Sequence, residues 1–246
     1  MNLRRWDIEE LLHRRTDLST FVIHWTRNLD GNDAKSNLLN ILEEDRVIDA
    51  RTPMEAAKTK IEAKLEGPLL ERALNSQKVV CFTEAPLEQA WSLICNIRLR
   101  KIQLAPFGIA FTKLTARQNG INPVWYVDMS PTGHDWIMNH IWKLVDRALD
   151  GEGEFHNDPI ARVAPFVEGM GTWPAGGKKE FWWEREWRHL GDLPLLRRDL
   201  AVVLCPEKDM EDFEPLLKSK RRTVPMVDPT WGLERMIAHL AGASVV

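Results

Sequence analysis

Residues 178–190 read KKEFWWEREWRHL, which places glutamates and arginines between three tryptophans with no proline or glycine to mark a loop. Successive side chains of a β-strand alternate between faces, so a strand here would have one largely aromatic face, formed by Phe181, Trp183, Arg185 and Trp187. The opposite face would carry the carboxylates, as Trp182, Glu184, Glu186 and Arg188. Two carboxylates beside a buried aromatic face are costly to desolvate, which predicts a function for this strand. The structural alternative is a solvated face on which Arg185 and Arg188 are ordinary surface partners.

The composition is typical of a soluble globular protein. The chain has 246 residues, 44% hydrophobic residues and a formal net charge of −3, which argues against bulk electrostatic binding of nucleic acid but leaves a local basic patch open. Three scattered cysteines, Cys81, Cys95 and Cys205, predict buried thiols in a reducing compartment rather than disulfides or a zinc site. We find neither a membrane-spanning apolar run nor the apolar core of a signal peptide, so we expect a cytoplasmic protein with no membrane contact.

Hydrophobic periodicity predicts one α+β domain over residues 1–246. The expected strands cover residues 19–26, 79–84, 107–114, 122–129, 178–190, 200–206 and 222–228. The expected helices cover residues 4–15, 36–45, 53–74, 87–101, 130–151, 207–219 and 229–241, with Ser36 as a cap. Residues 151–177 are expected to be irregular, and the last four elements form a βαβα extension over residues 198–243.

Several polar residues on the expected strands could bind a ligand. On FVIHWT (21–26), His24 and Thr26 share a face, where an imidazole and a hydroxyl would suit a ribose, although a core histidine is the simpler interpretation. Glu84 ends an apolar strand and either caps the next helix or contributes to a site. The single tyrosine, Tyr126, would by default pack in the core with its hydroxyl anchored. The cationic run KSKRRT (218–223) could touch phosphates, but a helix C-terminus is the simpler interpretation.

The segments FVIHWT, LLNILEEDRVIDA, CFTEAPL, FGIAFTK, GINPVWYV and EREWR occur in an order that resembles the abortive-infection family of the AbiGi type. These are bacterial phage-defence proteins from toxin–antitoxin-like loci. The resemblance covers residues 20–190, and its most specific parts are CFT-E-x-PL, N-PV-Y and E-x-EWR. The same skeleton is similar to mono-ADP-ribosyltransferases, including DarT-like toxins that modify nucleic acid. It implies a single-domain ADP-ribosyltransferase fold, with central antiparallel or mixed sheets flanked by helices.

The resemblance also implies residue roles. His24 would hydrogen-bond a ribose of NAD, with support from Thr26, and Tyr126 would stack on the nicotinamide. Glu186 would be the catalytic carboxylate and Glu184 would face the acceptor, although the sequence does not separate the two. These cofactor-binding residues are completed by Glu84 and Arg188.

Three functions fit these residues. The first is an NAD-dependent mono-ADP-ribosyltransferase toxin of phage defence, with NAD as substrate, a nucleic acid or protein as acceptor, and an antitoxin or chaperone as a further partner. The second is a non-catalytic antitoxin or sensor that binds a partner protein. The third, a metal-dependent nuclease built on Glu84, Glu184 and Glu186, is disfavoured because Arg185 and Arg188 would compete with a metal ion. We therefore expect no metal ion, and we favour the transferase over the binding protein without deciding between them.

Overall fold

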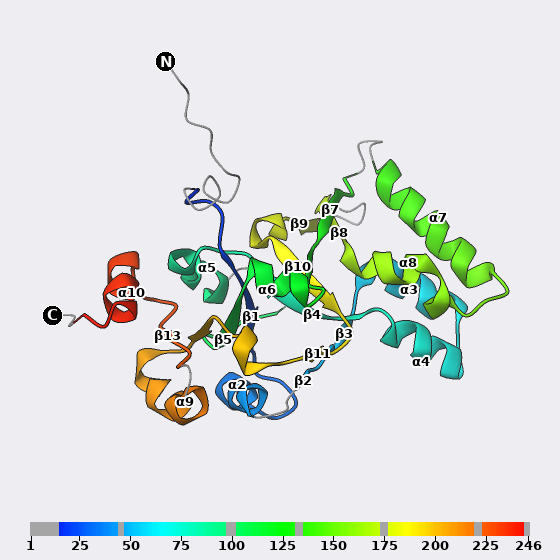
Figure 1. Cartoon of the computed structure of the whole chain (residues 1–246). Coiled ribbons are helices and arrows are strands. Elements are labelled where there is room, and N and C mark those ends of the chain that lie inside the picture. The colour runs from blue at the N-terminus through cyan, green and yellow to red at the C-terminus, as the bar shows by residue number, and fades with distance from the viewer. Residues whose placement is uncertain are drawn as a thin grey trace, which may run out of the picture. The chain divides into compact units, whose positions relative to one another are not determined.

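The structure is a computed structural model that describes residues 15–43, 47–96, 102–130, 135–172, 177–218 and 223–243 (Figure 1). Internal contacts divide the chain into two compact units. Unit 1 comprises Met1–Arg46, Thr83–Ala116 and Leu195–Val246, and unit 2 comprises Val47–Phe82 and Arg117–Pro194. Both units contain helices and strands, which confirms the α+β class. The single-domain organisation stays a prediction, and the helix expected at 4–15 falls almost wholly outside the described residues.

In unit 1, β1 has a paired strand on each side. The strands of this unit follow the order β13 (Met226–Val227), β12 (Val202–Leu204), β5 (Gly108–Thr112) and β1 (Phe21–Trp25). β5 pairs antiparallel with both β1 and β12, whereas β12 and β13 are parallel. On the other side of β1, Ile23 pairs with Thr83, the last residue of β4 (Lys78–Thr83). A strand with neighbours on both sides buries most of its residues, which explains the apolar run of β1.

A tight turn sets the start of the first described helix. Asp30 and Gly31 both have positive φ, 55° and 80°, and Leu29 and Asn32 exchange two backbone hydrogen bonds of 3.0 Å around them. Asp33 then caps the helix, because its Oδ1 accepts from the backbone N–H of Ser36 at 2.7 Å. The prediction that Ser36 is the cap was therefore wrong. The helices of unit 1 are α2 (Ala34–Leu42), α5 (Trp91–Ile94), α9 (Met210–Leu217), α10 (Leu233–Leu240) and the first part of α6 (Lys113–Gln118).

The core of unit 1 lies against the buried face of β1 that carries Ile23 and Trp25. Trp25 donates from Nε1 to Thr83 Oγ1 at 3.0 Å, which satisfies the indole N–H inside the core. The other buried members of this cluster come from helices, from other strands and from the turns beside them: Ala90, Leu93, Ala110, Val202, Leu204, Val227, Trp231 and Met236.

The described residues of unit 2 contain three groups of strands. The first group holds β3 (Thr52–Pro53), β4, β10 (Glu186–Leu190) and β6 (Asn122–Pro123), in that order. The second pairs β2 (Val47–Ile48) with β11 (Leu193–Pro194). The third has the order β7 (Trp125–Asp128), β8 (Val167–Thr172) and β9 (Lys178–Lys179). The strand expected at 122–129 is therefore two strands, and the stretch 151–177, expected to be irregular, contains β8.

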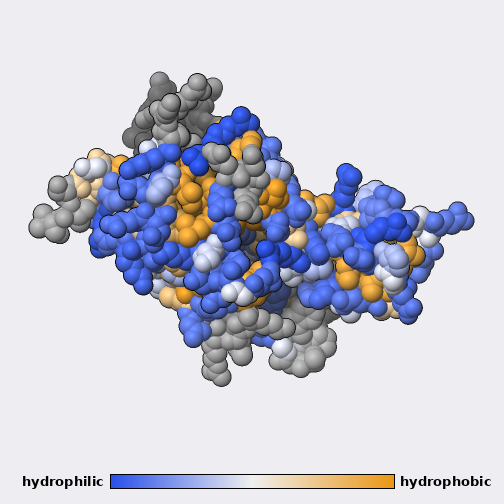
Figure 2. All heavy atoms as spheres, turned by 90° about the horizontal axis from the view of Figure 1, so that it is seen from below, coloured by the Kyte–Doolittle hydropathy of each residue, from blue (hydrophilic) through white to orange (hydrophobic). Residues whose placement is uncertain are grey.

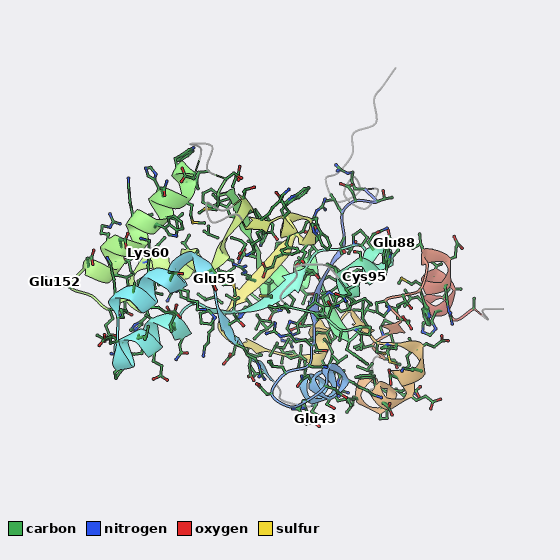
Figure 3. All side chains as sticks on the ribbon, turned by 180° about the vertical axis from the view of Figure 1, so that it is seen from behind. Glu43, Glu55, Lys60, Glu88, Cys95 and Glu152 are labelled. Carbon is green, nitrogen blue, oxygen red and sulfur yellow. The ribbon has the colours of Figure 1, made fainter. Side chains whose placement is uncertain are left out.

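Among the described residues, the α-helices that lie wholly in unit 2 are α3 (Glu55–Lys64), α4 (Gly67–Asn75), α7 (Trp136–Asp150) and α8 (Pro159–Val163). The single helix expected over 53–74 is interrupted at Leu65 and Glu66, whose backbone is extended, with φ of −116° and −136°. Lys60 on α3, labelled in Figure 3, pairs with Asp146 on α7 at 2.6 Å. The buried side of α7 consists of Met138, Ile141, Val145 and Ala148, which belong to the apolar core of unit 2.

The surface view in Figure 2 is mainly hydrophilic, with apolar side chains exposed in several separate places. Cys81 and Cys95 are exposed, so the prediction of three buried cysteines holds only for Cys205. Burial, and then the nearby carboxylates of Asp209 and Asp228, raise the pKa of the Cys205 thiol to about 12. Within the described residues, every helix is too short or too polar to cross a membrane.

Candidate functional site

The tryptophan-rich segment is not one continuous strand. Phe181–Glu184 forms a short 3₁₀ turn, and Arg185 adopts the left-handed conformation with φ 45° and ψ 58° before β10 begins at Glu186. The left-handed residue interrupts the strand alternation, so the predicted faces are wrong before Glu186. Trp182 and Trp183 are 58% and 37% exposed, whereas Trp187 alone of the three tryptophans is buried.

Glu184 and Glu186 consequently belong to different elements. Glu184 ends the 3₁₀ turn, while Glu186 opens β10 and shares a strand side with Arg188. The predicted pair of glutamates on one strand face is therefore wrong. The charge repulsion expected there is replaced by an ion pair between Glu186 and Arg188.

Arg188 is the centre of this site. Its Nε donates to Glu186 Oε1 at 3.0 Å, and one terminal nitrogen donates to Glu186 Oε2 at 2.8 Å. The same nitrogen contacts Glu168 Oε2, and the other donates to the carbonyl of Pro165 at 2.6 Å. The side chain is only 2% exposed, so protein groups surround the guanidinium. Burial alone would lower the pKa of Arg188, but Glu186 and Glu168 more than offset this, and the pKa is raised.

Sequence reasoning did not find Glu168 or Lys179. Glu168 lies on β8 with its side chain 8% exposed, and its Oε1 accepts a close contact from Lys179 Nζ on β9. Burial acts to raise the pKa of Glu168, but Arg188 and Lys179 outweigh burial, so that the pKa lies below its ordinary value. Lys179, Glu168, Arg188 and Glu186 thus form a continuous series of alternating charges, which we call the charge chain. The available signal was a lone carboxylate between Val167 and Met170 in an apolar stretch.

Tyr126 also holds the start of β10. The backbone N–H of Glu186 donates to the Tyr126 hydroxyl oxygen at 2.6 Å. Burial is the main cause that raises the pKa of Tyr126, which keeps the phenol protonated at neutral pH. Cys81 on the neighbouring β4 adds a hydrogen bond to the Glu186 side chain. The predicted stacking of Tyr126 on nicotinamide stays a prediction.

The other predicted residues lie in unit 1. His24 is a half-buried residue of β1, opposite Ile109 of β5. Thr26 follows β1 and is buried, with its hydroxyl oxygen 2.8 Å from the carbonyl of Ala34. Glu84 follows β4 and pairs with Lys113 at 2.6 Å, with its side chain 9% exposed. Glu186, Arg188 and Tyr126 are thus brought together within unit 2, and the predicted contact of that cluster with His24, Thr26 and Glu84 stays a prediction.

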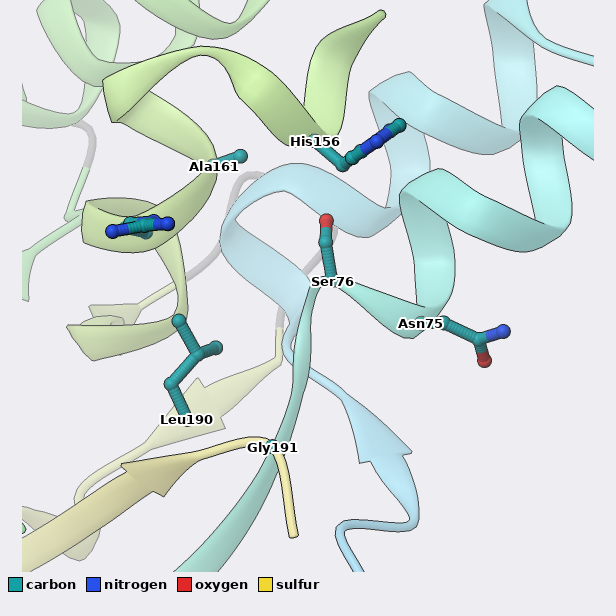
Figure 4. Close-up of a pocket in the computed structure, with 7 residues that line it drawn as sticks. Asn75, Ser76, His156, Ala161, Leu190 and Gly191 are labelled. Atoms are coloured by element: carbon teal, nitrogen blue, oxygen red, sulfur yellow. The ribbon is translucent and has the colours of Figure 1, made fainter.

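A separate pocket of unit 2, of about 150 Å³, is shown in Figure 4. Its lining residues are Asn75, Ser76, His156, Ala161, Arg162, Leu190 and Gly191. Beside it, the buried Gln77 donates to Ser76 Oγ and to the carbonyl of Ala161, while its own Oε1 has no hydrogen-bond partner in the described structure. The lining contains none of the predicted site residues and no carboxylate. The charge chain is therefore the candidate site.

The similarity of this chain to known proteins is found at the level of structure. No protein-family model matches this chain, and no curated protein sequence matches it. Among solved structures, the chain is similar to Thermus sp. 2.9 DarT in complex with NAD+, with 12% sequence identity and a TM-score of 0.35, over 87% of this chain and 97% of that chain. A structure of the same protein in complex with ADP-ribosylated ssDNA has the same identity and TM-score and covers 87% and 96% of the two chains. At this level of similarity the comparisons assign the chain to no family.

Proposed function

We propose that this chain is an NAD-dependent mono-ADP-ribosyltransferase, with Glu186 as the catalytic carboxylate. The observation that carries the proposal is the setting of that side chain. Both of its oxygens accept hydrogen bonds from the buried Arg188, yet it keeps 19% of its surface exposed. A carboxylate held in this way keeps its position and still has lone pairs to offer a ligand.

The transfer of ADP-ribose from NAD requires a carboxylate in a fixed position. The bond between the ribose C1′ of NAD and the nicotinamide nitrogen breaks, and its electron pair leaves with nicotinamide. The ribose then carries an oxocarbenium-like positive charge, as in glycoside cleavage. Glu186, hydrogen-bonded to the ribose 2′-hydroxyl, stabilises that charge without having to reorganise. An acceptor oxygen or nitrogen attacks C1′ and gives its proton to a base, a role for which Glu184 is the nearest carboxylate in sequence.

The rest of the assignment follows the sequence resemblance. His24, Thr26 and Glu84 bind NAD, and the acceptor is a nucleic acid or a protein. The exposed faces of Trp182 and Trp183, directly before the two glutamates, suit stacking with a base or an aromatic group. We place the activity in a bacterial phage-defence system of the toxin–antitoxin kind, within the cytoplasm, with an antitoxin or chaperone as partner.

The test uses the purified chain with labelled NAD and three acceptors: a single-stranded DNA, an RNA and a cell lysate. Nicotinamide release and label transfer are measured for wild type, Glu186→Gln, Glu184→Gln and the control Glu180→Gln. Glutamine keeps an oxygen for Arg188, so the fold is preserved while the charge is lost. We expect nicotinamide release to fall about 10²–10³-fold in Glu186→Gln, the range for losing a preorganised electrostatic group. Glu180 is 46% exposed at its side chain, so its variant should match wild type.

Nicotinamide release by Glu186→Gln at the wild-type rate would refute the assignment of the catalytic residue. Loss of label transfer without loss of nicotinamide release in Glu184→Gln would assign Glu184 to the acceptor. A wild-type chain that releases no nicotinamide with any acceptor, and whose overexpression leaves growth unaffected, would favour the non-catalytic antitoxin or sensor.

A further inference from the structure

We propose that Glu168 is a positioning residue of the transferase site, acting on Glu186 through Arg188, and that Lys179 completes this arrangement. The inference rests on the proposed function. Glu168 lies outside the segments that suggested that function, Lys179 precedes the segment EREWR, and both residues come from strands other than the one that carries Glu186.

The first argument is the geometry of Arg188. A flexible guanidinium bound only to Glu186 could swing together with it, and the pair would have no fixed place. Glu168 contacts the same terminal nitrogen that donates to Glu186, and the carbonyl of Pro165 accepts from the other terminal nitrogen, so that the orientation of the guanidinium is set by β8 and by the turn before it. Because the guanidinium is planar and donates two parallel hydrogen bonds to Glu186, a fixed orientation of Arg188 also fixes the plane of the Glu186 carboxylate.

The second argument is the charge of Glu168. If Glu186 were the one carboxylate beside the buried Arg188, the cation would neutralise its charge, and Glu186 would be only a salt-bridge partner. With Glu168 present, Arg188 is shared between two carboxylates, and Lys179 in turn balances Glu168. The charge chain alternates in sign and sums to zero, so Glu186 keeps an effective negative charge towards a ligand.

The third argument is the register of the three-stranded sheet. Tyr126 on β7 and Glu168 on β8 are paired residues of two parallel strands, which places their side chains on the same face. Tyr126 accepts a hydrogen bond from the backbone of Glu186, and Glu168 accepts one from Arg188, the ion-pair partner of Glu186. Two adjacent strands therefore hold Glu186 at two points, one on its main chain and one at its side chain.

The experiment compares Glu168→Gln, Lys179→Met and the control Lys178→Met. Lys178 precedes Lys179 on β9, is 66% exposed and does not contact Glu168 in the described structure. The first readout is the ¹H–¹⁵N signal of the Arg188 Nε–H group, assigned by its absence in Arg188→Lys. We expect this signal to shift, and its hydrogen exchange to speed up, in Glu168→Gln and to a smaller extent in Lys179→Met. In Lys178→Met the signal should be unchanged.

The second readout is nicotinamide release. In Glu168→Gln, kcat should fall about 10- to 100-fold, the range for misplacing a catalytic group by about 1 Å, while KM for NAD stays within about twofold of wild type. The variant Glu168→Asp, which keeps the charge, should recover part of kcat, and its circular dichroism and melting temperature show whether each variant is folded.

An unchanged Arg188 signal in folded Glu168→Gln would overturn the inference, as would a rise in KM with no change in kcat. A wild-type chain without nicotinamide release overturns the proposed function instead. The signal of Arg188 then still decides whether Glu168 holds the Arg188–Glu186 pair.

Discussion

At the scale of single residues, the backbone conformation of Arg185 determines how the two glutamates of the acidic segment are placed. Its left-handed backbone separates the 3₁₀ turn that ends with Glu184 from the strand that begins with Glu186. A non-glycine residue with this φ carries a cost of about 1–2 kcal/mol, which the surrounding contacts must offset. The two glutamates are for this reason independent groups rather than neighbours on one face.

Substitution of Arg185 tests this break between the 3₁₀ turn and β10. A β-branched residue is strongly disfavoured at positive φ, whereas asparagine tolerates it. We expect Arg185→Val to lower the free energy of unfolding by about 1–2 kcal/mol more than Arg185→Asn does. Denaturant unfolding monitored by tryptophan fluorescence measures both variants, and equal stability would contradict the left-handed assignment.

Removal of the Tyr126 hydroxyl tests the anchor at Glu186. In Tyr126→Phe the backbone N–H of Glu186 loses its acceptor, which should cost about 1–3 kcal/mol in the free energy of unfolding. The neighbouring Trp125 is 52% exposed, so Trp125→Phe is the matched control and should change stability little. Denaturant unfolding of both variants gives the comparison, and an equal loss in the two would argue against the hydrogen bond.

At the scale of elements, the strands with apolar, β-branched sequences could be predicted and the glycine-containing ones could not. The run FVIHW predicts β1 because a central strand needs apolar residues on both faces. β8 has the sequence VEGMGT, in which two glycines lower strand propensity and the buried Glu168 resembles a surface residue. The partners of that glutamate, Lys179 and Arg188, come from other strands, so the local sequence around Glu168 does not predict them.

At the candidate site, too, only part of the acidic segment 178–190 could be predicted from its sequence. The predicted alternation holds from Glu186 onwards, since Glu186 and Arg188 share one side of β10 and form an ion pair that was not predicted. The alternation failed at Arg185 because its backbone conformation is left-handed, and the sequence carries no glycine or asparagine there as a signal.

Gly171 on β8 offers a stability test for this element. Its φ is 97°, and an added Cβ would lie 2.4 Å from Asp128 Oδ1 and 2.5 Å from Ser130 Oγ. Gly171→Ala should therefore lower the free energy of unfolding by about 2 kcal/mol or more, from backbone strain and steric overlap together. Gly153 has open space around it and no positive φ, so Gly153→Ala should be close to neutral. Thermal and denaturant unfolding of the two variants check the difference, and equal effects would contradict the crowding at Gly171.

At the scale of the whole molecule, the charge chain couples stability to pH. The folded-state pKa of Glu168 lies below its ordinary value of 4.5, because Arg188 and Lys179 outweigh burial. A carboxyl group with a lowered folded-state pKa stabilises the protein above its unfolded pKa, and this contribution is lost as pH falls through the folded value.

We therefore expect the melting temperature of wild type to drop in acid below about pH 4.5, partly through Glu168. In Glu168→Gln the melting temperature should be lower at pH 7, and the loss on acidification should be smaller. Calorimetry between pH 7 and pH 3 measures both curves. Parallel curves for the two proteins would show that Glu168 does not contribute this term.

The division of the chain between its two units has a consequence for biosynthesis. Unit 1 begins first, with β1, but its sheet lacks β12 and β13 until residues beyond Leu195 have left the ribosome. Unit 2 is complete in sequence at Pro194. Since nascent chains fold as their segments emerge, the charge chain can assemble on the translating ribosome while the older N-terminal segment still waits for the partners that close its sheet.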